Sequence, residues 1–536
     1  MKRQLLNLLV ATVMMISCSK DDSTEDVIPK SSLKQIESFK FLASENEGLD
    51  VDVTASINES AKQITATMPF GSDISKLKPT IKSSALSKVT PTTDTRIDFS
   101  QAVEYGVIAE DQTSTIYTVN VDVAKSSEAR ITDFNLLTSI NNDGTNSNQI
   151  YFDVYGTIDE TNKTITLHIP EGSLDADLIP SVEYSTGATI SPSAENPLTE
   201  GVDYIITAEN GDTSTYKIIY NYIPNERKIL IDLYHANQNN LLNWDITSLN
   251  IAEWEGITLY DQRVNQIDFT NKDIETLTAD VGKLSELTDL VVQNTDSDLK
   301  LTSIPQEIGN LTKLRSLFLN GNSIETIPSS IGNLAELDRL ALNSNKLSSL
   351  PEEIGNLTNL KWLILNDNGL QYLPGSIGNL SNLTELFLNN NRLLELPEGI
   401  GNLQALKVLR LRTNSLIELN NSIAEMPQIE TVDLGYNNFR EFPSQLIEMQ
   451  NLKNILFDGN RLRTVPSELG NMTNLEIASF YRNRLSVLPE ELGDLNKLKT
   501  LNIQRNFLWS IPQKICDLES NYGTEIIKDN RTDCRN

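Results

Sequence analysis

The chain has 536 residues, and its 73 Asp and Glu outnumber its 44 Lys and Arg, which gives a formal net charge of −29. This length accommodates about three or four domains. An acidic surface repels phosphate groups, so nucleic acid is a poor partner. Three Cys and two His are too few for a Cys/His metal cluster or a thiol–imidazole dyad, and we expect neither a metal nor a cofactor.

The first segment has the layout of a secretory signal. A basic head at residues 1–3 precedes an apolar stretch at residues 5–16, which is too short to remain as a spanning helix. Met15-Ile16-Ser17-Cys18 then resembles a bacterial lipobox. The resemblance implies cleavage after residue 17 and lipid on the Cys18 thiol. An ordinary signal peptide followed by a Cys is the alternative.

Residues 18–30 are predicted to form an acidic tether. The run Ser19-Lys20-Asp21-Asp22 is similar to an export signal with which some Gram-negative bacteria place lipoproteins on the outer face of the outer membrane. This resemblance implies a lipid-anchored protein of the outer membrane that faces the cell exterior. The alternative is a flexible, solvated linker that carries no sorting signal.

Two tandem β-rich modules are predicted at residues 31–126 and 127–225. Alternating runs such as Ile64–Met68 indicate half-buried strands. The modules repeat one another, because Ile36-Glu37-Ser38-Phe39 returns as Ile131-Thr132-Asp133-Phe134, 95 residues later. This period fits one β-sandwich domain. The modules resemble the immunoglobulin-like domains that bacterial surface lipoproteins carry between anchor and effector domain, which implies a spacer role.

Residues 264–511 follow one pattern. A skeleton of the form LxxLxLxxNxLxxLP, often followed by xxIGNL, restarts every 23 residues from Leu314 to Leu498, and two earlier units begin at Val264 and Leu287. These eleven units resemble leucine-rich repeats of the 23-residue class. The expected fold is therefore an α/β solenoid in which stacked repeats bury seven apolar positions each, and in which the Asn at position nine forms a ladder.

Both ends of the solenoid need a cap. Residues 226–263, with a short helix near Ile229–Asn237 followed by Trp244 and Trp254, resemble the N-terminal cap of plant-type leucine-rich repeats, but without its Cys pairs. Residues 512–536 are expected to form the C-terminal cap. Secretion favours a disulfide between Cys516 and Cys534, which would add about 3 kcal/mol; two unrelated thiols are the alternative.

A partner site is predicted on the concave face. Positions four and six of each repeat point into the core, whereas positions three, five and seven, which include Asp433, face the concave surface. Four apolar side chains there are expected to form one patch: Phe318, Trp362, Ile364 and Phe387. A polar half with aromatic rings and Arg side chains lies beyond it: Arg410, Arg412, Tyr436, Tyr481 and Arg482. Exposed aromatic residues beside Arg are typical of binding hot spots, although scattered apolar residues without a function are the alternative.

No pattern of catalysis accompanies these features. The sequence has no Gly-rich phosphate loop, no Gly-x-Ser-x-Gly elbow and no His-Glu-x-x-His motif. We therefore expect a non-catalytic cell-surface lipoprotein that binds a protein partner with the concave face of its repeats. A glycan-binding lipoprotein of a nutrient-uptake system is the alternative.

Overall fold

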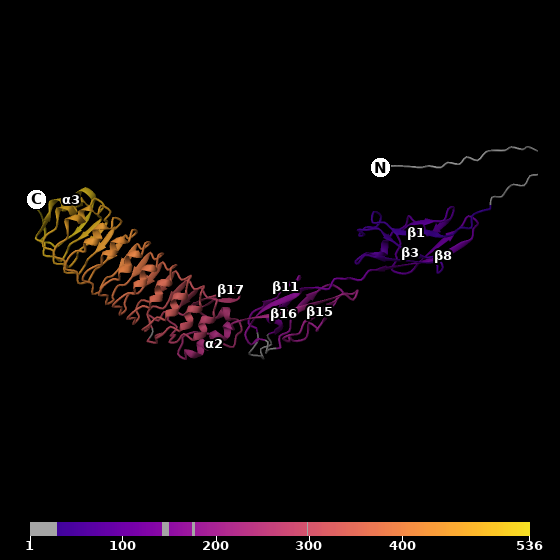
Figure 1. Ribbon diagram of the computed structural model, residues 1–536, viewed down its shortest axis with the longest axis horizontal. Coiled ribbons are helices and arrows are strands. Elements are labelled where there is room, and N and C mark those ends of the chain that lie inside the picture. Colours follow the sequence, from indigo (N-terminus) through magenta and orange to yellow (C-terminus); the bar gives the residue numbers. More distant parts are fainter. Residues whose placement is uncertain (1–28, 142–149, 174–176, 297, 536) are drawn as a thin grey trace, which may run out of the picture. The chain divides into compact units, whose positions relative to one another are not determined.

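The computed structural model describes residues 29–141, 150–173, 177–296 and 298–535. Cys18, the predicted lipidation site, lies outside these residues. Two β-sandwich modules precede a long repeat domain, as the sequence predicts. Figure 1 shows β1, β3 and β8 in the indigo first module, and β11, β15 and β16 in the second.

The first module has a three-stranded and a five-stranded sheet, with strand orders β2-β1-β5 and β3-β4-β8-β7-β6. Alternate residues of β4 are buried, because only one face of its sheet meets the core. Buried residues from both sheets form a single hydrophobic cluster. The strands are β1 (Ile36–Phe41), β2 (Val53–Thr54), β3 (Ser56–Asn58), β4 (Gln63–Met68), β5 (Thr80–Ser83), β6 (Lys88–Thr90), β7 (Val103–Ile108) and β8 (Ser114–Val123), with a 3₁₀ turn η1 (Ile74–Lys76).

The second module repeats this plan, with strand orders β10-β9-β13 and β11-β12-β16-β15-β14. The repetition extends to single contacts. The Tyr117 hydroxyl donates to Glu59, 2.7 Å away, and the Tyr216 hydroxyl donates to Glu160 at the equivalent place. The elements are β9 (Ile131–Leu136), α1 (Thr138–Asn141), β10 (Val154–Tyr155), β11 (Thr157–Asp159), β12 (Thr164–Pro170), β13 (Ser181–Tyr184), β14 (Thr189–Ser191), β15 (Tyr204–Thr207) and β16 (Thr213–Ile223).

The repeat domain contains one parallel sheet with a strand from each repeat, β18 to β28. In Figure 1 the repeats follow one another from magenta to the yellow C-terminal end, where α3 lies. The strands are β18 (Arg263–Asp268), β19 (Asp289–Val291), β20 (Ser316–Phe318), β21 (Arg339–Ala341), β22 (Trp362–Ile364), β23 (Glu385–Phe387), β24 (Val408–Arg410), β25 (Thr431–Asp433), β26 (Asn454–Leu456), β27 (Ile477–Ser479) and β28 (Thr500–Asn502).

A 3₁₀ segment returns the chain on the other side of each repeat except the last, where α3 follows, and in most segments a Gly lets neighbouring repeats approach. A Cβ on Gly355 would lie 2.3 Å from the Ser376 carbonyl oxygen of the next repeat. This close approach explains the Gly of the IGNL motif. The segments are η4 (Ala279–Lys283), η5 (Gln306–Asn310), η6 (Ser329–Asn333), η7 (Glu352–Asn356), η8 (Gly375–Asn379), η9 (Glu398–Asn402), η10 (Asn421–Glu425), η11 (Ser444–Glu448), η12 (Ser467–Asn471) and η13 (Glu490–Asp494).

The leucine skeleton is the core. The seven apolar positions of the repeat that begins at Leu360 are all buried, and one hydrophobic cluster runs from the N-terminal cap to the C-terminal cap. Full burial stabilises each of these side chains by about 1.5–3 kcal/mol. The stack therefore derives its stability from contacts between repeats rather than within one repeat.

The N-terminal cap consists of η3 (Ile251–Glu253), β17 (Ile257–Tyr260) and the helix α2 (Glu226–Ala236), whose N-cap is Asn225. The rings of Trp244 and Trp254 stack with their centroids 4.7 Å apart. β17 pairs antiparallel with β18 and so closes the first edge of the sheet. At the other end, β29 (Ser510–Pro512), α3 (Gln513–Tyr522), β30 (Glu525–Ile527) and β31 (Asp533–Arg535) follow the last repeat, and β30 adds a further parallel strand to the sheet.

Candidate functional site

The strand register determines which side chains face the concave surface. Leu317 and Leu319 are fully buried, whereas Phe318 between them is half-buried. Across the sheet, Phe318 pairs with Ala341, and Ala341 pairs with Ile364. Position five of each repeat therefore forms one continuous row on the concave side.

Three of the predicted site residues surround a pocket of about 230 Å³ on this face. Phe318, Trp362 and Ile364 line it, together with Arg339. Ala341, in the repeat between Phe318 and Ile364, has a side chain too short to fill the space between the two larger ones. Trp362 remains 45 % exposed, so this hollow presents a large aromatic ring to solvent.

Phe387 extends the apolar row, and an arginine covers it. Phe387 is half-buried and pairs with Arg410 across β23 and β24. The Arg410 guanidinium lies 5.7 Å from the centre of the Phe387 ring. A cation over an aromatic face is attracted by the ring quadrupole, so the apolar and the polar halves of the predicted site meet at this pair.

A second cluster surrounds Arg412. Its guanidinium lies 3.2 Å from the Asp458 carboxylate and 3.8 Å from that of Asp433. It also lies 4.5 Å from the centre of the Tyr436 ring. A Cβ on Gly459 would lie 2.7 Å from the same ring, so only Gly leaves room for this Tyr. Two carboxylates and one aromatic ring therefore contact the Arg412 guanidinium.

Asp433 departs from the expected exposure. It occupies position five, but only 3 % of its surface is accessible, because its short side chain lies among larger neighbours. Burial raises the pKa of its carboxyl, while the Gly435 N–H, 2.9 Å away, and Arg412 act in the opposite direction. Ala341 and Ser479, at the same position of other repeats, are likewise buried. Facing the concave side is therefore not sufficient for exposure.

Not all of the remaining predicted site residues contact one another. Tyr481 is half-buried, and Arg505 rather than Arg482 lies over its ring, at 5.4 Å. Tyr436, Arg482 and Arg505 occupy position eight, where the backbone is left-handed, with φ values of 54°, 56° and 57°. These side chains therefore leave from the turn after the strand and not from the strand itself.

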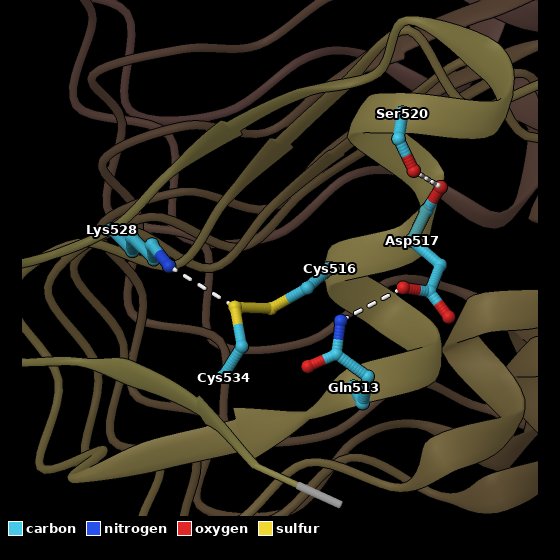
Figure 2. Close-up of a disulfide and its surroundings, with 6 residues drawn as sticks. All are labelled: Gln513, Cys516, Asp517, Ser520, Lys528 and Cys534. Atoms are coloured by element: carbon cyan, nitrogen blue, oxygen red, sulfur yellow. Dashed lines mark hydrogen bonds between the residues drawn. A yellow bond between two sulfur atoms is a disulfide. The ribbon is translucent and has the colours of Figure 1, made fainter.

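Cys516 and Cys534 are joined by a disulfide, with their Cα atoms 6.2 Å apart. Figure 2 shows that the bond links α3 to the last strand. Lys528 donates to the Cys534 sulfur, 3.5 Å away, and Gln513 donates to Asp517 along α3, at 2.8 Å. The disulfide closes the C-terminal cap over the end of the repeat core.

Arg339 was missed as a site residue, although its place at position three beside Trp362 was a usable signal. The contacts of Arg412 with Asp433 and Asp458 were also missed, since they join three repeats. Among the described residues, no group of three or more His, Cys, Asp or Glu could hold a metal ion. Within the same part of the chain, no helix has the length and apolar character needed to cross a membrane.

Comparison with protein families identifies both parts of the chain. Residues 36–121 and 146–219 match the family described as SGBP, N-terminal. Residues 331–414 and 405–516 match the leucine-rich repeat region family, and residues 313–334 match the leucine-rich repeat family. The chain therefore contains leucine-rich repeats, and regions of the SGBP N-terminal type precede them.

Several solved structures are similar to the chain. A leucine-rich repeat protein of Leptospira interrogans is 32 % identical, covers 50 % of this chain and 67 % of its own, and has a TM-score of 0.47. A plant peptide hormone receptor, RGFR1, in complex with RGF2 is 28 % identical over 52 % of this chain and 53 % of its own, at 0.43. An internalin of Listeria monocytogenes is 20 % identical over 50 % and 82 %, at 0.40. No curated protein is significantly similar to the chain.

Proposed function

We propose that this protein is a non-catalytic surface lipoprotein that binds a protein partner with the concave face of its leucine-rich repeats. The observation that carries the proposal is the pocket lined by Phe318, Trp362 and Ile364 beside the Arg410–Phe387 pair. Aromatic residues and Arg dominate the energetics of protein interfaces, because they bury large areas and keep a polar group available. Leucine-rich repeat domains generally bind proteins, which agrees with this assignment.

Replacing Trp362 and Phe387 together by Ala tests the concave site. Trp362 is exposed and Phe387 half-buried, so the double variant should fold with a melting temperature only slightly below that of the wild type. Proximity labelling on intact cells should enrich one surface partner with the wild-type chain and lose it with the variant. Tyr372→Ala removes an exposed aromatic ring outside the pocket and is the matched control. A double variant that still captures the same partner would exclude this face as the site.

The anchoring belongs to the same proposal. Lipid on Cys18 would hold the chain on the outer membrane with residues 18–30 as a tether, and the two β-sandwich modules would act as spacers between the anchor and the repeats. The sequence Met15-Ile16-Ser17-Cys18 and the acidic run after it support this arrangement. Protease treatment of intact cells should remove the chain if it faces the exterior.

A second candidate function is glycan binding in nutrient uptake. The match of residues 36–121 and 146–219 to the SGBP N-terminal family favours it, because such domains occur in surface glycan-binding proteins. A neutral-glycan array separates the two candidates. Specific binding by the full chain that survives the Trp362→Ala/Phe387→Ala substitution would favour the glycan function, whereas a blank array would favour the protein partner.

A further inference from the structure

Four arginines gather on one lateral edge of the repeat domain. Arg440, Arg461, Arg463 and Arg484 line a hollow of about 610 Å³, with Glu441 as its single acidic residue. All four side chains are exposed. We name this group the arginine edge. It lies in the loops that follow the ladder Asn of each repeat, away from the concave strands.

These arginines have no acidic partner in the part of the chain that the structure describes. Some other cations of the repeats are paired with carboxylates: Lys453 with Glu430 at 2.8 Å, for example, and Arg412 with Asp458 at 3.2 Å. This group of positive charges occurs in a chain whose net charge is −29. Four unpaired positive charges around one hollow repel one another, and an anion in the hollow relieves that repulsion.

The repeat geometry places these arginines in two pairs at equivalent positions of successive repeats: Arg461 and Arg484 at position ten, and Arg440 and Arg463 at position twelve. The backbone N–H of Arg461 donates to the Phe439 carbonyl, and that of Arg484 donates to the Leu462 carbonyl, both at 2.9 Å. Position ten of successive repeats is thus held in register, at a spacing of about 4.8 Å, as in a parallel sheet. This spacing is close to the length of one sugar unit in an extended polysaccharide, so a linear polymer with one anionic group per unit matches the edge.

Exposed aromatic rings continue the same row. Phe507 occupies position ten in the repeat after Arg484, and its N–H donates to the Leu485 carbonyl at 2.8 Å. Phe507 and Trp509 are 65 % and 75 % exposed, and both line a further hollow of about 420 Å³. Planar rings in solvent are suited to stacking on the apolar face of a sugar ring. Regular cations followed by open aromatic rings favour a polysaccharide over an acidic polypeptide.

We infer that the arginine edge, with Phe507 and Trp509, is a binding site for a linear anionic polysaccharide. Guanidinium groups would pair with sulfate or carboxylate groups on successive sugars, since the planar guanidinium forms two parallel hydrogen bonds with either anion. The site is separate from the concave pocket, so the full chain can hold a protein and a polysaccharide at once. The inference does not depend on the proposed partner of the concave face.

Binding of defined polymers to the full chain tests this inference. Dextran sulfate tests binding of sulfate groups, and polygalacturonate tests binding of carboxylate groups. Neutral dextran is the uncharged control, and poly-L-glutamate is the anionic polypeptide control. At least one anionic polysaccharide should bind, with an affinity that falls as salt shortens the Debye length from about 10 Å at 0.1 M to about 3 Å at 1 M. The stronger of the two identifies the anionic group. Poly-L-glutamate binding as tightly as both polysaccharides would overturn the inference.

Two pairs of substitutions locate the site. Arg461→Gln with Arg484→Gln should weaken polysaccharide binding about tenfold or more, and Trp509→Ala should weaken polysaccharide but not poly-L-glutamate binding. Lys346→Gln with Arg392→Gln removes two exposed cations from position ten of earlier repeats and should have little effect. Equal losses from both pairs, or none from the first, would overturn the inference. Trp362→Ala/Phe387→Ala should leave polysaccharide binding unchanged, which separates this test from that of the concave site.

Discussion

At the scale of single residues, the ladder Asn shows how a polar group can be required by an apolar core. The Asn414 side chain donates to the carbonyls of Leu388 and Leu411, at 2.9 and 3.0 Å, and accepts from the Leu393 N–H at 3.0 Å. These backbone groups lie in the turn after the strand, where no sheet partner is available. The sequence predicts this ladder because the Asn recurs at one position of a known repeat skeleton.

The exposure of the concave residues could not be predicted in the same way. The register alone places Phe318 and Asp433 in the same row, yet one is half-buried and lines a pocket, and the other is buried beside Arg412. The difference depends on the sizes of neighbours in adjacent repeats. The left-handed turn at Tyr436 likewise redirects a side chain in a manner that strand alternation does not describe.

Asp433 gives a pH-dependent prediction. Burial raises its folded-state pKa above the usual value of 3.8. At a pH between the two pKa values, the folded state therefore holds a proton that the unfolded state has lost. Stability therefore falls as pH rises from the unfolded-state pKa through the folded-state pKa, and the loss is complete above the latter. Asp433→Asn keeps an acceptor for the Gly435 N–H without the charge. Its melting temperature should rise relative to wild type as pH is raised from acid to neutral.

Thermal unfolding across that pH range is the measurement. Asp367→Asn, in the exposed turn of an earlier repeat, is the matched control and should follow the wild type. If Asp433→Asn instead became progressively less stable than wild type toward neutral pH, attraction to Arg412 would outweigh burial, and the direction of the pKa shift would be wrong.

At the scale of elements, the two caps are stabilised by different interactions: a buried ion pair in the N-terminal cap and a disulfide in the C-terminal cap. The N-terminal cap buries Glu226 completely, where it pairs with Arg263 at 2.7 Å and accepts from the Val264 N–H at 2.7 Å. Burial raises the pKa of Glu226, although both contacts oppose the shift. The helix and the two Trp were predictable from a family resemblance. The buried Glu226–Arg263 pair was not predictable, because the two residues are 37 residues apart in the sequence and belong to no repeated pattern.

The C-terminal cap gives a second prediction, since its disulfide closes a sequence separation of 18 residues. Replacing Cys516 and Cys534 together by Ala should destabilise the cap by about 3 kcal/mol, because the unfolded chain regains freedom. Repeat arrays can open locally, so the effect should concentrate in the cap. Hydrogen exchange should accelerate in α3 and β30 and stay unchanged in α2.

A reducing agent supplies the control for that experiment. Once the wild-type disulfide is reduced, its exchange in α3 should approach that of the double variant. Unchanged exchange in α3 after either treatment would show that packing of Ile515 and Leu518, which are buried in the core, holds the cap without the covalent link.

At the scale of the whole molecule, periodicity made the architecture predictable and the partners unpredictable. Repetition of about 95 residues and of 23 residues fixes two modules and a solenoid, because each repeat must bury its apolar side chains against a neighbour. Ligand sites arise where repeats differ from one another. Arg461 and Arg463 are close in the sequence, but only the fold brings them together with Arg440 and Arg484 around one hollow.

The proposed anchor gives the last prediction. Each buried CH₂ of an acyl chain contributes about 0.8 kcal/mol to membrane binding, so several chains on Cys18 would hold the protein in the membrane. Cys18→Ser removes the thiol that carries them. The wild-type chain should be found in the membrane fraction and incorporate labelled palmitate, whereas Cys18→Ser should be found in the soluble fraction without label.

The remaining cysteines provide the matched control for this experiment. Cys516 and Cys534 are bonded to each other, so their replacement by Ala should leave membrane association and palmitate labelling intact. Cys18→Ser protein that stayed in the membrane fraction would contradict lipid anchoring at this residue. The proposed tether and the spacer role of the two modules, which both assume this anchor, would then be contradicted as well. The proposals for the concave pocket and the arginine edge do not depend on the anchor and would be tested separately.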